Sequence, residues 1–340
     1  MCAPQVGSRL AFEANVATAL LCLIACSVHA AVGPPDGSTA QQQALVAGDP
    51  PFKAATLSLR DLPAATHRES LFNGRDLQGW DVWLGAADWQ QTYAPVKWQP
   101  IGLNRDATQV FSVVTEEGAP AIFSTGKIFG ALISKRDAGN YHLHLQFKWG
   151  VHQWTPMPRN SGLLYHSRGG YGAWFGTVME SMEFQFQEHA LGMLIPVGRS
   201  TPGRSIDGAY WNMHASVQVG QDKAIAYPWR RYMPGGPLRP IAFEAYTVDA
   251  HSNRERPAGQ WNEVDLYAFG DRAVHVVNGV PVLEARDMKW APHRRAAARP
   301  LTHGRIQLES EGTDVYFRDV YIERIDRLPT IIAASAAAQD

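Results

Sequence analysis

Short runs in which apolar and polar residues alternate, separated by Gly, Pro and Asn, fill the chain from residue 71 onward and constrain its fold most strongly. The clearest run spans 141–147, where every second residue, beginning with Tyr141, is large and apolar. Side chains on a β-strand point alternately to the two faces of a sheet, so these runs predict half-buried strands. His142 and His144 would then face outward. Many short strands with turn signals between them predict an all-β fold, an antiparallel β-sandwich with long loops.

Three further segments extend this prediction. Residues 315–322 alternate as well, which places Val320 and Tyr321 on opposite faces, with Tyr321 on the side of the apolar residues. Residues 263–278 predict a hairpin that turns at a Gly-Asp dipeptide. Residues 196–257 are dense in Pro, Gly and Arg, and they predict long loops over one face of the domain.

A strand with one polar face is the best candidate for function. In the segment 180–188 the apolar residues fall on one face, whereas Glu183 and Gln185 fall on the other with further polar residues. Glu and Gln are poor strand formers and are costly on a buried face without partners. The polar face is therefore either a solvated outer surface or a concave surface that binds a ligand.

The preceding segment predicts the neighbouring strand of a long-looped hairpin. Residues 160–166 begin with Asn-Ser-Gly and end at His166, just before that loop. Pairing of the two strands would bring Asn160, His166 and Glu183 together at one end of the sheet. An ordinary turn at Asn160 and a hydrogen-bonded surface histidine at His166 are the alternatives.

Aromatic residues and one further histidine add candidates. Tyr171 and Trp174 lie in the connecting loop, where they could form a stacking platform for a sugar ring or a small apolar cluster. His275 lies near the Asn-Gly turn that ends the predicted hairpin, so a functional role there competes with a purely structural one.

Other side chains are predicted to have structural rather than functional roles. His142 and His144 share a strand face and could ligate a metal ion, but solvated strand histidines are the simpler interpretation. Trp261 is predicted to anchor the core. Glu309 and Arg318 are predicted to lie on neighbouring closing strands, where they could pair with each other.

The bulk composition excludes several function classes. A formal charge of −1 argues against a nucleic-acid partner, which requires a basic face. The chain has no Gly-x-Ser-x-Gly elbow, no phosphate loop and no His-Glu-x-x-His motif. No apolar run reaches the ~20 residues of a membrane-spanning helix. All three cysteines (Cys2, Cys22 and Cys26) lie near the N-terminus, so the mature domain has no disulfide, thiol nucleophile or Cys-ligated metal.

The N-terminus predicts an exported protein. Arg9 precedes a short apolar region at 16–26, and small residues before Ala31 suit signal cleavage after Ala30. The alternative is a lipobox, Leu-Ile-Ala-Cys, in which Cys26 would carry a lipid anchor. The protein would then be periplasmic or anchored to the outer membrane. The expected organisation is a signal at 1–30, a flexible tether at 31–69, the sandwich at 70–326 and a C-terminal tail at 327–340.

Five segments follow one another along the chain: Leu-Phe-Asn-Gly-Arg-Asp-Leu-Gln-Gly-Trp at 71–80, Asn-Ser-Gly at 160–162, the polar strand at 182–188, Trp-Asn and His-x-x-Asn-Gly within 259–279, and the closing strands at 304–309 and 317–320. In this order they resemble the 3-keto-disaccharide hydrolase domain family, which has a concanavalin A-like β-sandwich (jelly roll) fold. The chain has His166, Glu188 and Glu309 where the family often has Arg, Asp and Gln.

The resemblance implies cleavage of glycosides that are oxidised to a ketone at C3. Such a ketone acidifies the proton on C2, so a base can remove it, the C1 substituent leaves, and water can add back. A divalent cation could stabilise the enolate, although the sequence shows no ligand set for one. The implied roles are Glu183 as base or metal-binding carboxylate, His166 or His275 as proton donor, and Asn160, Gln185, Tyr171, Trp174 and Arg318 as contacts to the sugar.

Two other function classes remain open from the sequence. A noncatalytic carbohydrate-binding module could use the same fold, because a fold does not determine function. An interaction protein could use the loops at 196–257. A carbohydrate is the expected ligand of both the enzyme and the binding module. Nothing in the sequence indicates an oligomeric state.

Overall fold

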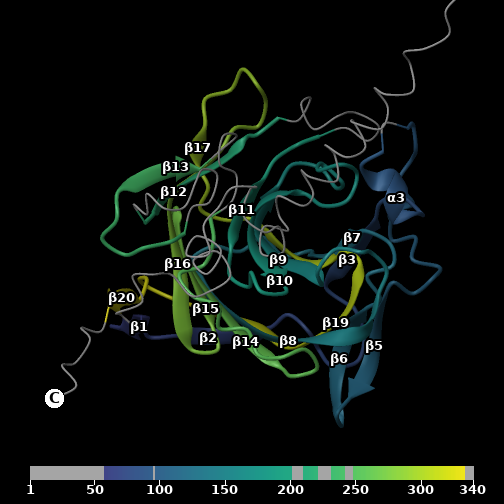
Figure 1. Cartoon of the computed structure of the whole chain (residues 1–340), viewed down its shortest axis with the longest axis horizontal. Coiled ribbons are helices and arrows are strands. Elements are labelled where there is room, and N and C mark those ends of the chain that lie inside the picture. Colours follow the sequence, from purple (N-terminus) through teal and green to yellow (C-terminus); the bar gives the residue numbers. More distant parts are fainter. Residues whose placement is uncertain (1–56, 95, 201–209, 221–230, 242–247, 334–340) are drawn as a thin grey trace, which may run out of the picture.

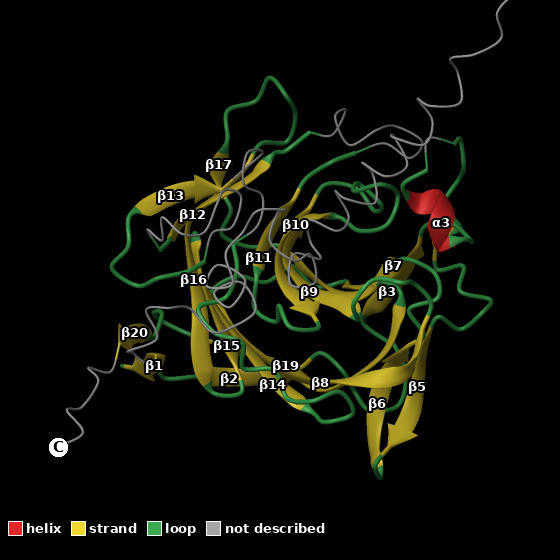
Figure 2. Ribbon diagram, in the orientation of Figure 1, coloured by secondary structure: helices red, strands yellow, loops and turns green. Residues whose placement is uncertain are grey.

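The computed structural model describes residues 57–94, 96–200, 210–220, 231–241 and 248–333. In these residues nearly all regular structure is β-strand, and most of the strands form two antiparallel sheets that face each other (Figures 1 and 2). One short helix, α3 (Trp89–Thr92), begins after Asp88, whose side chain accepts a hydrogen bond from the backbone N–H of Gln90. The structure is the predicted concanavalin A-like antiparallel β-sandwich.

The smaller main sheet has seven strands and carries the candidate site described below. Its central strands are long and buried on both faces, whereas its last strand is a two-residue edge. In order across the sheet the strands are β11 (Leu194–Val197), β10 (Glu180–Gln187), β9 (Asn160–Arg168), β18 (Arg305–Ser310), β7 (Gly130–Ser134), β3 (Trp80–Leu84) and β4 (Gly102–Leu103).

The larger sheet has eleven strands, and a separate two-stranded sheet pairs β1 (Leu57–Arg60) with β20 (Thr330–Ala333). Along the larger sheet lie β13 (Leu238–Ile241), β12 (Met213–Gln218), β16 (Val280–Trp290), β15 (Arg272–Val277), β14 (Asn262–Phe269), β8 (Tyr141–Gln153), β19 (Thr313–Arg324), β6 (Ala119–Ser124) and β5 (Phe111–Glu116), with β17 (Arg299–Pro300) on β16 and β2 (Thr66–Ser70) on β19.

The hydrophobic core lies between the two main sheets. Phe147 on β8 stacks on Phe186 on β10, with ring centroids 4.4 Å apart. Both rings are fully buried, as are Leu143 and Leu145. The alternation of residues 141–147 therefore predicted this strand and its inward face correctly. The hairpin of β14 and β15, which turns at residues 270–271, is confirmed as well.

A β-bulge reverses the predicted faces of β19. The register between β8 and β19 shifts between Arg318 and Tyr321, and Asp319 has a φ of 53°. An extra residue in one strand turns every later side chain to the opposite face. As a result Val320 is buried in the core and Tyr321 faces outward, contrary to the prediction.

The segment 196–257 was predicted to form long loops, but it also contains strands. It contains β12 and β13, which extend one edge of the larger sheet, and Val248 bridges to Leu194 on β11. The predicted tail also contains a strand, β20, and the predicted tether contains β1 and β2. The predicted signal and the lipobox at Cys26 lie outside the described residues. In the described ranges, no helix has both the length and the apolar character needed to cross a membrane.

Three side chains that were predicted to have structural roles lie elsewhere than expected. Trp261 is at the surface of the larger sheet, where its Nε1–H donates to Glu117 Oε2 at 2.7 Å. Glu309 and Arg318 do not pair, because β18 and β19 belong to different sheets. Neighbouring positions in the sequence were mistaken for neighbouring strands in space.

Candidate active site

Two carboxylates meet on the face of the seven-stranded sheet that points away from the core. Glu183 projects from β10 and Glu309 from β18, and Gly162 lies on β9 between these two strands. A Cβ atom on Gly162 would be 2.4 Å from Glu183 Oε1 and 3.1 Å from Glu309 Oε2. The missing side chain therefore gives the two carboxyl groups the space in which they approach each other.

A third carboxylate joins them from the turn that follows β18. Glu311 accepts a hydrogen bond from Asn160 Nδ2 at 2.6 Å and one from the hydroxyl of Tyr93 at 3.4 Å. A parallel bridge between Asn160 and Gly312 holds this turn against the start of β9. Glu311 and Tyr93 were not predicted as site residues, because no strand or motif pattern in the sequence includes them.

Burial makes all three carboxyl groups hold their protons unusually tightly. Burial, together with the negative charge of Glu311, raises the pKa of Glu183 to about 8. Burial raises the pKa of Glu311 to about 7, although hydrogen bonds from Tyr93 and Asn160 oppose this. The pKa of Glu309 lies well above its ordinary value, because Glu309 is buried beside the other two charges. Near neutral pH the cluster therefore contains both protonated and ionised carboxyl groups.

The polar face is enclosed rather than solvated, since Glu183 is only 6% exposed and Gln185 1%. Several side-chain atoms around it nevertheless have no hydrogen-bond partner, among them Oδ1 of Asn160, Oε1 of Gln185 and Oε2 of Glu309. Both polar atoms of the Gln187 amide lack a partner as well. Buried polar atoms rarely stay unpaired, so this face has the groups to receive hydroxyls of a ligand. The carboxylate and amide oxygens would also suit a divalent cation.

A row of aromatic rings leads away from the carboxylates. Tyr93, which bonds to Glu311, packs edge-on against Phe175 at 5.1 Å, and Phe175 packs against Trp174 at 4.8 Å. Trp174 continues to Trp211 at 5.0 Å. The predicted candidate Trp174 therefore belongs to a ring cluster that is continuous with the carboxylate site.

Tyr171 lies on the same face but nearer β3. Its ring stacks on Trp83 with centroids 5.7 Å apart. Its hydroxyl donates to Asp81 Oδ2 at 2.9 Å and accepts from Arg305. The two predicted aromatic candidates thus occupy separate clusters, and the hydroxyl of Tyr171 is already paired on both sides.

The structure places His275 in the core, on the opposite face of β10 from Glu183. Its ring stacks on Phe184 at 4.1 Å. Its Nδ1–H donates to the carbonyl of Gly192 at 3.0 Å, which leaves Nε2 to accept from the hydroxyl of Tyr165 at 3.1 Å. Burial lowers the pKa of His275 to about 4, so the ring is neutral at ordinary pH.

His166 is also on the core side. A bulge in β9 lies opposite the step from Glu180 to Met182, and His166 has a φ of 50°. The ring packs edge-on against Tyr141 at 5.8 Å and is fully buried. Burial lowers the pKa of His166 to about 3. Of the predicted group, Asn160 and Gln185 share the face of Glu183, whereas the two histidines do not.

Arg318 lies on the other main sheet. It donates to Gln146 Oε1 at 2.8 Å, and its guanidinium sits 3.7 Å from the ring centroid of Trp261. Both partners belong to the outer surface of that sheet, so the hydrophobic core separates Arg318 from the carboxylates.

The comparisons with known proteins agree with the sequence resemblance. The family described as 3-keto-alpha-glucoside-1,2-lyase-like domain matches residues 67–323. No curated protein matches the chain.

Similar solved structures include a proposed glycosyl hydrolase from Parabacteroides distasonis, at 17% identity and a TM-score of 0.42 over 76% of this chain and 94% of that one. A carbohydrate-binding module from Bacillus subtilis has 11% identity and a TM-score of 0.34 over 63% and 91% of the two chains. A β-glucanase from Bacillus licheniformis has 9% identity and a TM-score of 0.34 over 78% and 99%.

Proposed function

The chain belongs to the family of 3-keto-alpha-glucoside-1,2-lyase-like domains, and on that premise we propose that it cleaves glycosides whose sugar carries a ketone at C3. The bond to C1 breaks by elimination, and addition of water makes the net reaction a hydrolysis. The observation that carries this proposal is the cluster of Glu183, Glu309 and Glu311, three carboxyl groups that lie together and whose pKa values are all raised by burial.

The reaction requires one base and one acid on the same sugar ring. Glu183 takes the proton from C2 in its ionised form, which predominates only above its pKa of about 8, and the electrons of that C–H bond form an enolate with the C3 oxygen. When the enolate collapses, the C3 ketone re-forms, a double bond appears between C1 and C2, and the C1–O bond breaks. The departing oxygen takes a proton from a carboxylic acid, a role that suits Glu309, whose pKa lies well above its ordinary value.

Neighbouring groups would position the sugar. Asn160 and Gln185 offer unpaired amide oxygens to its hydroxyls, and Tyr93 and Trp174, which are half-buried members of the aromatic row, offer ring faces for stacking. The proposal gives His166 and His275 no part in proton transfer, because they are neutral and lie in the core.

A noncatalytic carbohydrate-binding module is the second candidate. The observation that favours it is the pair of aromatic clusters, Trp83 with Tyr171 and Trp174 with Trp211, on the face that carries the carboxylates. A binding module needs such platforms and amides but not carboxyl groups with opposite protonation states.

Turnover of chromogenic 3-keto-glucosides, both α and β, beside their non-oxidised parents tests the proposal. We expect release from a keto form only, and a loss of roughly 10²–10⁴-fold in Glu183→Gln, the usual worth of a positioned base. Glu69→Gln, a change at the surface strand β2, serves as the control and should keep full turnover. Saturable sugar binding without any release, weakened by Trp174→Ala, would instead establish a binding module.

We also propose that the protein is exported, either periplasmic after cleavage near Ala30 or lipid-anchored at Cys26 in the outer membrane. The support is the N-terminal pattern alone. The intact mass of the protein purified from its native cells separates the two forms, since an acylated Cys26 adds lipid to the N-terminus. An uncleaved chain in the cytoplasm would contradict both.

A further inference from the structure

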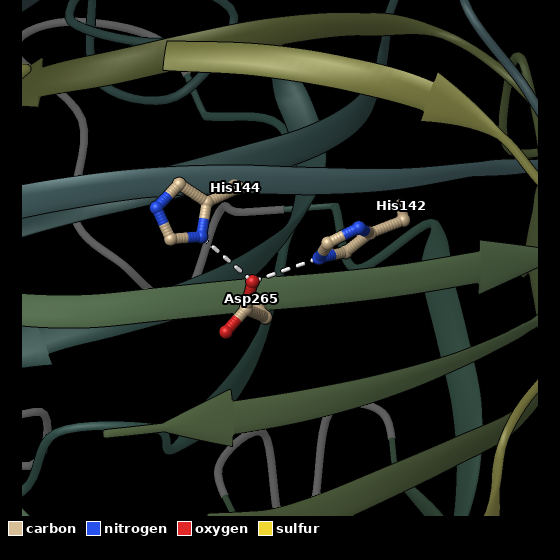
Figure 3. Close-up of side chains that lie close together, drawn as sticks. All are labelled: His142, His144 and Asp265. Carbon is tan, nitrogen blue, oxygen red and sulfur yellow. Dashed lines mark hydrogen bonds and ion pairs between the residues drawn. The ribbon is translucent and has the colours of Figure 1, made fainter. Parts of the chain in front are cut away.

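Two histidines and an aspartate converge on the outer surface of the eleven-stranded sheet, far from the carboxylate cluster. His142 and His144 project from β8 on the face opposite the core, and Asp265 is the register partner of His144 on the adjacent strand β14. His142 Nε2 lies 2.7 Å and His144 Nδ1 2.8 Å from the same oxygen, Asp265 Oδ1. Figure 3 shows both imidazole rings directed at this carboxylate.

The three donor atoms occupy the space of one coordination sphere. His142 Nε2, His144 Nδ1 and Asp265 Oδ1 all lie within 4.8 Å of one another. A Zn²⁺ ion with bonds of about 2.0–2.1 Å to nitrogen and oxygen holds its ligand atoms about 3–3.5 Å apart. The two imidazole-to-carboxylate distances of 2.7 and 2.8 Å would therefore lengthen when an ion binds, through small rotations of the side chains. Without an ion, one carboxylate oxygen must accept from two imidazole N–H groups. A metal ion would replace those two hydrogens.

Surrounding groups hold the rings in place. His142 stacks on Tyr267 with centroids 4.3 Å apart, and His144 stacks on Tyr321 at 4.9 Å. The second ring nitrogen of His142 lies 3.3 Å from Glu323 Oε2, which is the carboxylate–histidine arrangement that orients metal ligands in many proteins. The β19 bulge is what turns Tyr321 outward onto His144.

The site also has room for further ligands. Glu263 Oε1 lies 3.9 Å from His144 Nδ1 and its side chain is 44% exposed, so it can move in as a fourth ligand. The side chains of His142, His144 and Asp265 are 11–13% exposed, which leaves access for an ion and for water. Two imidazoles with carboxylate suit Zn²⁺ and similar transition metals better than Ca²⁺ or Mg²⁺, which prefer oxygen ligands alone.

We propose that His142, His144 and Asp265 bind one divalent transition-metal ion such as Zn²⁺, which clamps β8 to β14 on the side of the sandwich opposite the carboxylates. The proposal does not depend on the proposed enzymatic function. Glu263 completes the ligand set, and Glu323 positions His142 without contacting the ion.

Calorimetric titration of the metal-stripped chain with ZnCl₂ tests the site. We expect one equivalent of Zn²⁺ to bind, with an affinity at least tenfold lower in His144→Gln and in Asp265→Asn. His303→Gln is the matched control, because His303 is a surface histidine bonded to a carboxylate, Asp137, but without a second histidine. It should bind as the unchanged chain does. Absence of binding, or equal affinity in all four proteins, would overturn the proposal.

X-ray absorption at the zinc edge gives a second measurement that needs no substitution. The proposed site predicts two imidazole nitrogens around the ion in the unchanged chain, whereas an ion held by Glu183, Glu309 and Glu311 would show oxygen ligands only. Thermal unfolding of each variant shows whether it is folded. If either variant fails to fold, the spectrum decides, and a shell without imidazole would disprove the site.

Discussion

Glu183, Glu309 and Glu311 are the residues on which the proposed chemistry depends, and their proton affinities affect stability as well as activity. A carboxyl group whose pKa is higher in the folded than in the unfolded chain stabilises the fold at low pH and loses that contribution as pH rises through the folded value. The pKa of Glu183 rises from 4.5 to about 8 and that of Glu311 to about 7.

The free energy of unfolding should therefore fall between about pH 5 and pH 8. Glu311→Gln removes a like charge beside Glu183 and should flatten this decline, stabilising the protein at pH 8 by about 1–2 kcal/mol, the scale of one pKa unit. Urea denaturation at a series of pH values measures the free energy of unfolding and its decline with pH. The control is Asp326→Asn, a carboxyl that is 63% exposed. A decline of equal slope in Glu311→Gln would show that the cluster does not titrate as described.

The sequence predicted part of this site for a clear reason. Glu183, Gln185 and Asn160 lie on strands with strong alternation, so their common face could be inferred. Glu311 could not, because only the pairing of β18 with β9 and the Asn160–Gly312 bridge bring its turn to the site. Asp265 could not be inferred from the sequence either, because the two histidines that it contacts lie 121 and 123 positions away.

Strands β9 and β10 show how one irregular residue limits such predictions. Their pairing was predicted correctly, as was the long loop that joins them. The bulge near His166 was not, because a local change of backbone conformation leaves no periodic trace in the sequence. The bulge in β9 turned His166, the expected proton donor, toward the core, and the bulge at Asp319 likewise turned Tyr321 outward.

The central position of Gly162 on β9 gives a prediction at the scale of this strand. Gly162→Ala should displace the Glu183 and Glu309 carboxyl groups, since the new methyl would lie 2.4 Å from Glu183 Oε1. A displacement of about 1 Å can reduce turnover roughly 10²-fold, whereas a modest overpacking costs about 1–3 kcal/mol of stability. Turnover of the keto-glucoside and the melting temperature are the two measurements.

Gly170→Ala is the matched control, because a Cβ at Gly170 would meet no atom within 4 Å. It should leave both quantities unchanged. Full turnover in a folded Gly162→Ala protein would argue that the two carboxyl groups need not approach each other for catalysis.

In the whole molecule, one sheet serves both the core and the candidate site. Phe186 stacks on Phe147 across the sandwich, and on the reverse side of the same strand lie Glu183 and Gln185. Phe186→Ala should lower the free energy of unfolding by about 3–5 kcal/mol, as buried aromatic truncations do. Chemical denaturation measures the loss, with Val151→Ala, at an 84% exposed position, as the control. A loss below about 1 kcal/mol would show that the two sheets are not held together by this contact.

The pairing of β1 with β20 has a mechanical consequence. Leu57 pairs with Ala333 and Arg60 with Thr330, so the first and last described strands run antiparallel with their outer ends side by side. Tension applied through those two ends would act perpendicular to the strands, so the hydrogen bonds between β1 and β20 would break one after another (an unzipping geometry). The two main sheets would bear load only after β1 and β20 had separated, and their long central strands would still be intact at that point.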